Sequence, residues 1–216
     1  MKRYAATIDL NNANSAWTIL ARWVGRNRRV LDVGCGRGQL GNVLRAQFDC
    51  AITGIEINSE YARECAGYDR VIIGSAEDDA LLARIGESFD VIVCGDVLEH
   101  LREPEIPLRA FHDLLAPNGR LLISVPNVAH FRIRWMLLRG HWDYTPEGIM
   151  DATHLRWFTR ASLRALVARC CWRADACDFT VSPNLGRWLH RAPALKKWLP
   201  PTWFAAQFLL NLSPEK

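Results

Sequence analysis

Short apolar runs alternate with amphipathic segments along the first 126 positions of the chain. The apolar runs predict strands at residues 29–33, 51–57, 70–74, 89–95 and 119–125. Helical periodicity predicts helices at residues 14–24, 39–47, 59–66, 78–85 and 104–115. Strands that alternate with helices are typical of a parallel, doubly wound α/β sheet, which binds ligands at the carboxyl ends of its strands.

The regular alternation stops after Pro126. A helix is predicted next at residues 159–171, followed by two strands near residues 174–181 and 206–212, which are expected to form an antiparallel sheet edge. The roughly 33 residues that precede this helix are too many for a structureless connection inside a compact domain. We therefore expect them to form a lid or a substrate-recognition segment.

A glycine-rich turn joins the first predicted strand to the following helix. The sequence there is VLDVGCGRGQ, in which Asp32 precedes Gly34, Gly36 and Gly38. Such a turn brings backbone N–H groups and a helix N-terminus close to a ligand. Glycine suits it because a side chain would block that approach or oppose a positive φ. The spacing differs from the G-x-G-x-x-G of dinucleotide-binding turns and disfavours a nicotinamide cofactor.

This D-x-G-x-G-x-G pattern resembles the first motif of class I S-adenosylmethionine-dependent methyltransferases. The sequences CGDVLEHL at 94–101 and LLAPNGRLLISVP at 114–126 extend the resemblance over about residues 27–170. The resemblance implies a mostly parallel, seven-stranded Rossmann-like sheet with helices on both faces and a lid or acceptor segment after the fifth strand. It also implies S-adenosylmethionine as cofactor. We expect one domain over residues 1–216, with about 27–126 holding the cofactor and about 127–216 forming the lid, acceptor site and sheet edge.

The expected cofactor residues lie where the predicted strands end. Glu56 ends the second strand, where a carboxylate accepts hydrogen bonds from ribose hydroxyls. In related methyltransferases the turn after the third strand borders the adenine and often carries an Asp at the position of Ser75 in this chain. The Ala76 backbone or the side chain of Glu77 or Asp78 is then the expected adenine contact; a helix cap is the alternative role of the acidic pair. The resemblance assigns cofactor contacts to Asp32, Gly34, Cys35, Gly36, Gly38, Glu56, Ile57, Ala76, Glu77, Asp96 and Val97.

The predicted lid contains the sequence DATHLRWFT at 151–159. Its D-x-T-H-x-R-x-F-T pattern resembles a methyltransferase subgroup associated with cell-surface glycan and lipid-linked biosynthesis. We expect Tyr144, Asp151 and Arg156 to bind a small-molecule or glycan- or lipid-linked acceptor. His154 and His100 are candidate bases for a hydroxyl acceptor, because imidazole titrates near neutral pH. The alternatives are an Asp–His–Arg network that fixes the lid, and a backbone hydrogen bond for His100.

A divalent metal is a further alternative at the end of the fourth strand. Asp96, Glu99 and His100 match the E-x-x-E-H arrangement that holds a metal in the ubiquinone O-methyltransferases. Carboxylates together with an imidazole suit Mg²⁺ or Zn²⁺. Many metal-free relatives also carry Glu-His at this place, so we predict a site without a metal.

Positive charge and tryptophan gather in the second part of the chain. Residues 1–126 contain 14 Lys and Arg against 17 Asp and Glu, whereas residues 127–216 contain 13 against 6 and seven of the nine tryptophans. Basic aromatic stretches at residues 131–139 and 188–204 predict a subdomain that packs on the sheet edge. Peripheral contact with an anionic membrane surface is the alternative.

Several classes of function and location are disfavoured. No D/N-P-P-Y motif follows the fourth strand and no Pro-Cys pair is present, so base methylation of nucleic acid is not expected. No apolar run approaches about 20 residues, and the first ten residues lack the apolar core of a signal peptide. The seven cysteines show no metal-binding spacing and predict reduced thiols. We expect a cytoplasmic methyltransferase; a non-catalytic binding protein of the same fold is the alternative.

Overall fold

One sheet of seven strands organises the molecule. The computed structural model describes residues 8–185, 197–198 and 200–215, and its strands follow the order β3-β2-β1-β4-β5-β7-β6. Strands β1 to β5 are parallel, whereas β7 runs antiparallel to both β5 and β6. The strands are β1 Arg29–Val33, β2 Ala51–Glu56, β3 Arg70–Ile73, β4 Phe89–Gly95, β5 Leu115–Pro126, β6 Trp172–Val181 and β7 Ala205–Pro214. The predicted doubly wound, mostly parallel sheet is confirmed.

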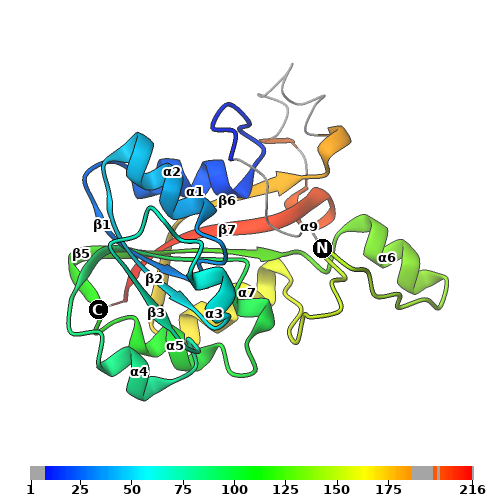
Figure 1. Ribbon diagram of the computed structural model, residues 1–216. Helices are drawn as coiled ribbons and strands as arrows, with labels where there is room; N and C mark the ends of the chain where they lie inside the picture. The colour runs from blue at the N-terminus through cyan, green and yellow to red at the C-terminus, as the bar shows by residue number, and fades with distance from the viewer. Residues whose placement is uncertain (1–7, 186–196, 199, 216) are drawn as a thin grey trace.

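Helices cover both faces of this sheet. Figure 1 shows α1 and α2 above the sheet and α4, α5 and α7 below it. The helices are α1 Ala16–Val24, α2 Gln39–Phe48, α3 Ser59–Ala62, α4 Asp79–Ala83, the 3-10 turn η1 Leu98–His100, α5 Glu105–Ala110, α6 Phe131–Leu138, α7 Arg160–Arg169 and α9 Pro201–Phe204. None of the helices in the described ranges combines the length and apolar character that a membrane crossing requires.

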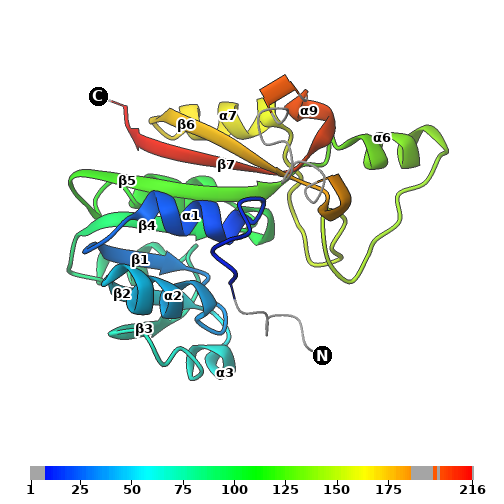
Figure 2. The same cartoon turned by 90° about the horizontal axis from the view of Figure 1, so that it is seen from above.

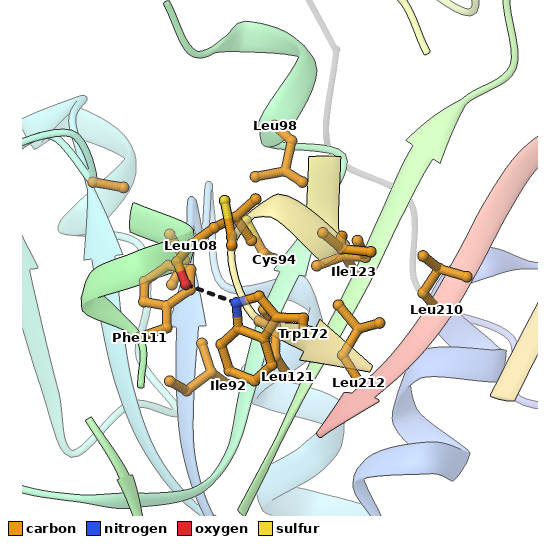
Figure 3. Packing of buried hydrophobic residues seen from close by; sticks show 14 of the residues in the cluster. Ile92, Cys94, Leu98, Leu108, Phe111, Leu121, Ile123, Trp172, Leu210 and Leu212 are labelled. Carbon is orange, nitrogen blue, oxygen red and sulfur yellow. Dashed lines mark hydrogen bonds between the residues drawn. The ribbon is translucent and has the colours of Figure 1, made fainter. Parts of the chain in front are cut away.

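Successive residues of the central strands pack into two separate apolar clusters. Val30 packs with α1 and α2, whereas Leu31 packs in the cluster on the opposite face; Val91 and Ile92 divide in the same way. Because both faces are covered, these strands are continuous apolar runs in the sequence. Trp172 belongs to the cluster that contains Leu31 and Ile92, and it donates its indole N–H to the Leu108 carbonyl at 2.7 Å (Figure 3). This bond joins strand β6 to helix α5.

The fifth strand begins earlier than the sequence predicts. The predicted strand starts at residue 119, after the turn-forming Pro-Asn-Gly residues 117–119, but β5 already pairs at Leu115 with Phe89 and resumes at Arg120 with Val91. The register shift between these pairs accommodates the Pro-Asn-Gly stretch, where Asn118 has a φ of 62°. The turn residues therefore form an irregularity within a strand.

The sequence predicts no particular helix between Pro126 and residue 159, but α6 lies there, which agrees with the expectation that this segment is not structureless. Ile133 is the one residue of α6 that is buried, so the helix lacks the apolar stripe by which a helix is usually recognised. Its N-cap is His130, whose side chain accepts a hydrogen bond from the Arg132 N–H at 3.3 Å. Histidine is not among the preferred N-cap residues. Most of the predicted 188–204 stretch falls outside the described residues.

Candidate active site

The glycine turn lies at the carboxyl end of β1 and has the backbone conformation that its sequence predicts. Gly34, Gly36 and Gly38 have φ values of 67°, 56° and 82°. The N–H groups of Gly34 and Cys35 donate to the Ile55 carbonyl of β2 at 2.8 and 3.1 Å. A Cβ at Gly34 would lie 2.6 Å from a methyl group of Val97. Glycine is therefore required both by the turn and by the close approach of the β4 loop.

Glu56, the last residue of β2, is tied directly to this turn. Its side chain is buried, and its two oxygens accept hydrogen bonds from the Gly36 and Asn58 N–H groups, each at 2.8 Å. Each carboxylate oxygen retains acceptor capacity after one such bond. The neighbouring Ile57 is 72% exposed. The edge thus presents an oriented carboxylate beside an apolar side chain, which suits the ribose and base of a nucleoside.

Asp32 lies beneath the turn and is paired with a residue that no sequence motif singles out. Its carboxylate accepts a hydrogen bond from the Tyr68 hydroxyl at 2.5 Å, and the Tyr68 oxygen accepts one from the Gly41 N–H at 3.1 Å. Burial raises the pKa of Asp32 to about 7, against the lowering effect of the Tyr68 bond, and Glu56 adds to the rise. A Cβ at Gly41 or Gly54 would meet the Tyr68 ring at 2.2 or 2.9 Å. Gly41 and Gly54, which leave room for the Tyr68 ring, are the only sign of this contact in the sequence.

The sequence offered Ala76, Glu77 and Asp78, in the loop after β3, as adenine contacts or helix caps, and the structure shows what each of them contacts. Ala76 is buried, and Glu77 accepts a hydrogen bond from the Glu103 N–H at 2.7 Å. Asp78 caps α4 by accepting from the Leu81 N–H at 3.1 Å. Both carboxylates therefore bind backbone, and the helix-cap interpretation is confirmed for Asp78. The Ala76 backbone stays the predicted adenine contact.

Asp96 follows β4 in the left-handed region, with a φ of 54°, which is uncommon for residues other than glycine but which aspartate adopts more readily than most. Its carboxylate accepts hydrogen bonds from the Ser124 hydroxyl of β5 and the Gln207 amide of β7, each at 2.7 Å. Burial raises the pKa of Asp96, and these two bonds oppose the rise. Gln207 could not be found from the sequence, because its contact depends on β7 lying beside β5.

Three further groups meet where the loop after β4 contacts the predicted lid. Glu99, His100 and His154 each offer a ligand atom within 4.8 Å of the others, and the two imidazole rings lie edge to face with centroids 4.8 Å apart. Glu99 is 1% exposed, and neither of its carboxyl oxygens has a hydrogen-bond partner. The predicted alternative metal set of Asp96, Glu99 and His100 differs, since the described bonds of the Asp96 side chain go to strands β5 and β7. The donor set fits either a divalent cation or a proton relay.

Burial sets the protonation of this cluster. It raises the pKa of Glu99 well above the usual range, with Asp96 adding to the rise. It lowers the pKa of His154, and the neighbouring His100 lowers it further. Both groups are therefore driven toward their neutral forms. A neutral imidazole at pH 7 has the proton-accepting nitrogen that a general base needs.

The 151–156 segment is anchored on η1. Backbone N–H groups of Leu155 and Arg156 donate to the Glu99 carbonyl at 2.8 and 3.0 Å, and the Arg156 Nε donates to the Arg102 carbonyl at 3.1 Å. Asp151 accepts from the Thr153 N–H at 2.8 Å. The bonds of Leu155 and Arg156 place the 151–156 segment beside the end of β4, whereas the Asp151 bond orders the segment internally.

The remaining described contacts of this region complete the comparison with the sequence. His154 Nδ1 lies 3.2 Å from the Ile149 carbonyl, and His100 Nδ1 lies 3.3 Å from the Thr153 carbonyl, which is the backbone bond expected as the alternative. Tyr144 is 54% exposed and its ring lies 6.3 Å from that of Trp157. The structure thus brings the two histidines together and leaves Tyr144 on an exposed aromatic group of the lid.

Comparison with known proteins identifies the family of this chain. A family model described as a methyltransferase domain matches residues 9–170. The chain belongs to the class I S-adenosylmethionine-dependent methyltransferases. It is 30% identical over 189 residues to a ubiquinone biosynthesis O-methyltransferase of Pasteurella multocida, a match that covers 76% of this chain and 74% of the relative.

Solved structures of methyltransferases share the fold. A SAM-dependent methyltransferase from Archaeoglobus fulgidus aligns with a TM-score of 0.66 and 18% identity, over 96% of this chain and 95% of that one. A magnesium protoporphyrin IX methyltransferase from Synechocystis, solved with bound SAH, aligns with a TM-score of 0.63 and 15% identity, over 99% and 90% of the two chains. The methyl donor of this methyltransferase is S-adenosylmethionine, as the sequence predicted.

Proposed function

We propose that this methyltransferase transfers the methyl group of S-adenosylmethionine to a hydroxyl oxygen of a small-molecule acceptor. The observation that carries the proposal is the position of two features at one sheet edge: Glu56 tied to the glycine turn, and the Glu99–His100–His154 cluster at the end of β4. Methyl transfer needs a donor and an acceptor held in line, together with removal of the acceptor proton. The O-methyltransferase name of the Pasteurella relative supports oxygen as the methylated atom.

The cofactor residues have separate parts in this proposal. The backbone of the 34–38 turn surrounds the amino-acid end of the cofactor, and Glu56 accepts the two ribose hydroxyls. Ile57 and Ala76 border the adenine, while Asp96 and Val97 lie at the methionine. Support comes from the positive φ angles of the turn and from the oriented Glu56 carboxylate.

His154 is the proposed base. The acceptor hydroxyl gives its proton to the neutral imidazole while its oxygen attacks the sulfonium methyl carbon, and S-adenosylhomocysteine departs with the C–S bonding electrons. His100 and Glu99 lie against the imidazole and influence its charge. The lowered pKa of His154 supports this role, because it keeps the base unprotonated at neutral pH.

The acceptor is proposed to belong to the glycan- or lipid-linked class, and residues 127–216 to carry its binding site. The D-x-T-H-x-R-x-F-T sequence supports the class, and the anchoring of residues 151–156 on η1 supports the location. Asp151, Arg156 and Tyr144 are the proposed acceptor contacts. The domain is proposed to act as one unit, since β6 and β7 complete the sheet that β1 to β5 begin.

Calorimetric titration with S-adenosylmethionine tests the cofactor half of the proposal. Glu56→Ala is expected to weaken affinity at least about 150-fold, because two charge-assisted hydrogen bonds to the ribose are lost, each contributing about 1.5 kcal/mol or more. Glu60→Ala is the matched control, since Glu60 is an exposed carboxylate four residues further on. Equal affinities of the two variants would contradict the role of Glu56.

Transfer of a labelled methyl group tests the acceptor half. The purified protein is incubated with labelled S-adenosylmethionine and, in parallel, with hydroquinone, with a bacterial lipid extract and with a soluble glycan fraction. We expect label in an alkali-stable ether in the lipid extract, and a large loss of the label with His154→Gln. Label on nitrogen or carbon would overturn the proposed O-methylation.

A further inference from the structure

Helix α6 carries large apolar side chains on its exposed surface. Figures 1 and 2 show α6 extending away from the sheet, beyond the end of β5. Leu138 is 78% exposed and Trp135 55% exposed. We use the name α6–α9 surface for the exposed residues of α6, its C-cap and the neighbouring α9, together with the half-buried Arg134; it consists of Phe131, Arg132, Arg134, Trp135, Leu137, Leu138, Arg139 and Trp203.

Arginines and aromatic rings alternate on this surface. The Arg139 guanidinium lies 4.7 Å from the centroid of the Trp135 ring, and that of Arg134 lies 4.5 Å from the Trp203 ring on α9. Residues 131–139 contain three arginines and no acidic residue. Positive charge and apolar area therefore form a single surface built from two distant segments of the chain.

We propose that the α6–α9 surface docks on an anionic phospholipid bilayer. Tryptophan, leucine and arginine together are the composition that binds the boundary between lipid headgroups and acyl chains. The arginines attract the anionic headgroups. The stacking of Arg134 on Trp203 and of Arg139 on Trp135 holds these guanidinium groups next to the apolar side chains that would enter the bilayer. The low burial of α6 fits this occupant, since Ile133 is the one buried residue of the helix and Trp135, Leu137 and Leu138 are exposed.

Two other occupants fit the surface less well. Phe131, Trp135 and Leu138 have the i, i+4, i+7 spacing of helices that bind in a protein groove, but such a groove would also have to supply anionic partners for Arg132, Arg134 and Arg139. A second copy of this chain would oppose the same three arginines to one another, and like charges that meet at an interface are unfavourable. The bilayer matches both the charge and the apolar area.

Docking in this way would bring the active site to the membrane. Helix α6 follows β5 after four residues, and the carboxyl end of β5 belongs to the sheet edge that carries Glu56 and Glu99. A lipid-linked acceptor would then reach the site from the bilayer. This consequence rests on the proposed function; the binding of the surface to lipid does not.

Vesicle flotation with the full chain tests the proposal. The protein is mixed with vesicles of phosphatidylglycerol and phosphatidylcholine in equal parts, or of phosphatidylcholine alone, and the floating fraction is measured. We expect binding to the anionic vesicles, with a blue shift of tryptophan emission. Each arginine near an anionic surface contributes about fivefold to the partition coefficient, so Arg132→Glu/Arg139→Glu is expected to weaken binding about 25-fold or more. Leu137→Ala/Leu138→Ala is expected to weaken it about tenfold.

Arg28→Glu/Arg84→Glu is the control, because it makes the same change of charge at exposed positions outside the α6–α9 surface, before β1 and at the C-cap of α4. Control binding equal to wild type supports the proposal; equal loss in the control and in Arg132→Glu/Arg139→Glu overturns it, since net charge alone would then explain binding. Absence of the wild type from the floating fraction overturns it as well. A wild-type dimer, measured by light scattering, that becomes monomeric in Leu137→Ala/Leu138→Ala also overturns it, because the surface would then bind a second copy of the chain. Titration with S-adenosylmethionine in parallel separates these results from failure of the proposed function.

Discussion

Replacing Tyr68 by phenylalanine removes the one described hydrogen bond to the buried Asp32 side chain and leaves the aromatic ring in place. The Tyr68 hydroxyl lies 2.5 Å from the carboxylate, and this bond lowers the pKa of Asp32 against the larger effect of burial, with a net value of about 7. The variant should therefore have an Asp32 pKa above that of the wild type. It should also leave the Gly41 N–H without its acceptor.

The expected loss of stability depends on pH. The pKa of Asp32 is about 7 in the folded protein, against an ordinary value of 3.8. Between these two pH values the folded state keeps a proton on Asp32 that the unfolded state has lost, so the wild type loses stability as pH rises from 3.8 to about 7. In Tyr68→Phe the folded pKa is higher still, and the loss continues to higher pH. A hydrogen bond between neutral groups contributes about 1 kcal/mol and one to a charged group about 1.5–3 kcal/mol. The two proteins should differ by about 1 kcal/mol at pH 5.5 and by about 2–3 kcal/mol at pH 8.5.

Urea unfolding, followed by circular dichroism across this pH range without cofactor, measures the difference. Tyr144→Phe is the control, because the Tyr144 side chain is exposed and its loss should cost little at any pH. A difference between wild type and Tyr68→Phe that stays constant or shrinks as pH rises would refute the reasoning about Asp32.

Three further substitutions test other parts of the structure. Gly34→Ala places a Cβ 2.6 Å from Val97 at a φ of 67°, so calorimetry should show a loss of S-adenosylmethionine affinity of at least about tenfold; unchanged affinity would contradict the close approach. Trp172→Phe loses the bond to the Leu108 carbonyl and opens space in the core, so the free energy of unfolding should fall by about 2–4 kcal/mol; a fall below about 1 kcal/mol would contradict it. His154→Gln should abolish the rise of kcat with pH, which in the wild type should have its midpoint below 6.5 because burial lowers the pKa of His154; a profile unchanged in shape would exclude His154 as the base.

The order of strands and helices in the first half was predictable because its signals are local. A strand covered on both faces must be apolar at successive positions, as Val30 and Leu31 are. A turn with positive φ at three positions requires glycine, and the 34–38 sequence supplies it. Glu56 was found for the same reason, since the end of a parallel strand next to such a turn is where a ligand-binding carboxylate is expected.

The segment between β5 and α7 was predicted less well because its signals are weak or depend on distant contacts. Helix α6 has no continuous apolar face, so periodicity did not detect it. The 151–156 segment was expected near the site, but its attachment to the Glu99 carbonyl could not be inferred from spacing.

Sequence by itself determined the α/β class, the glycine turn and the carboxylate at the end of β2, because backbone conformation and burial restrict which residues each position accepts. Only the tertiary structure decided the neighbours of the buried titratable groups: Tyr68 for Asp32, Gln207 for Asp96, and His154 beside Glu99. Each pair joins residues far apart in the chain, and strand order and loop path bring them together. Those contacts, through burial and hydrogen bonding, set the protonation of the active site.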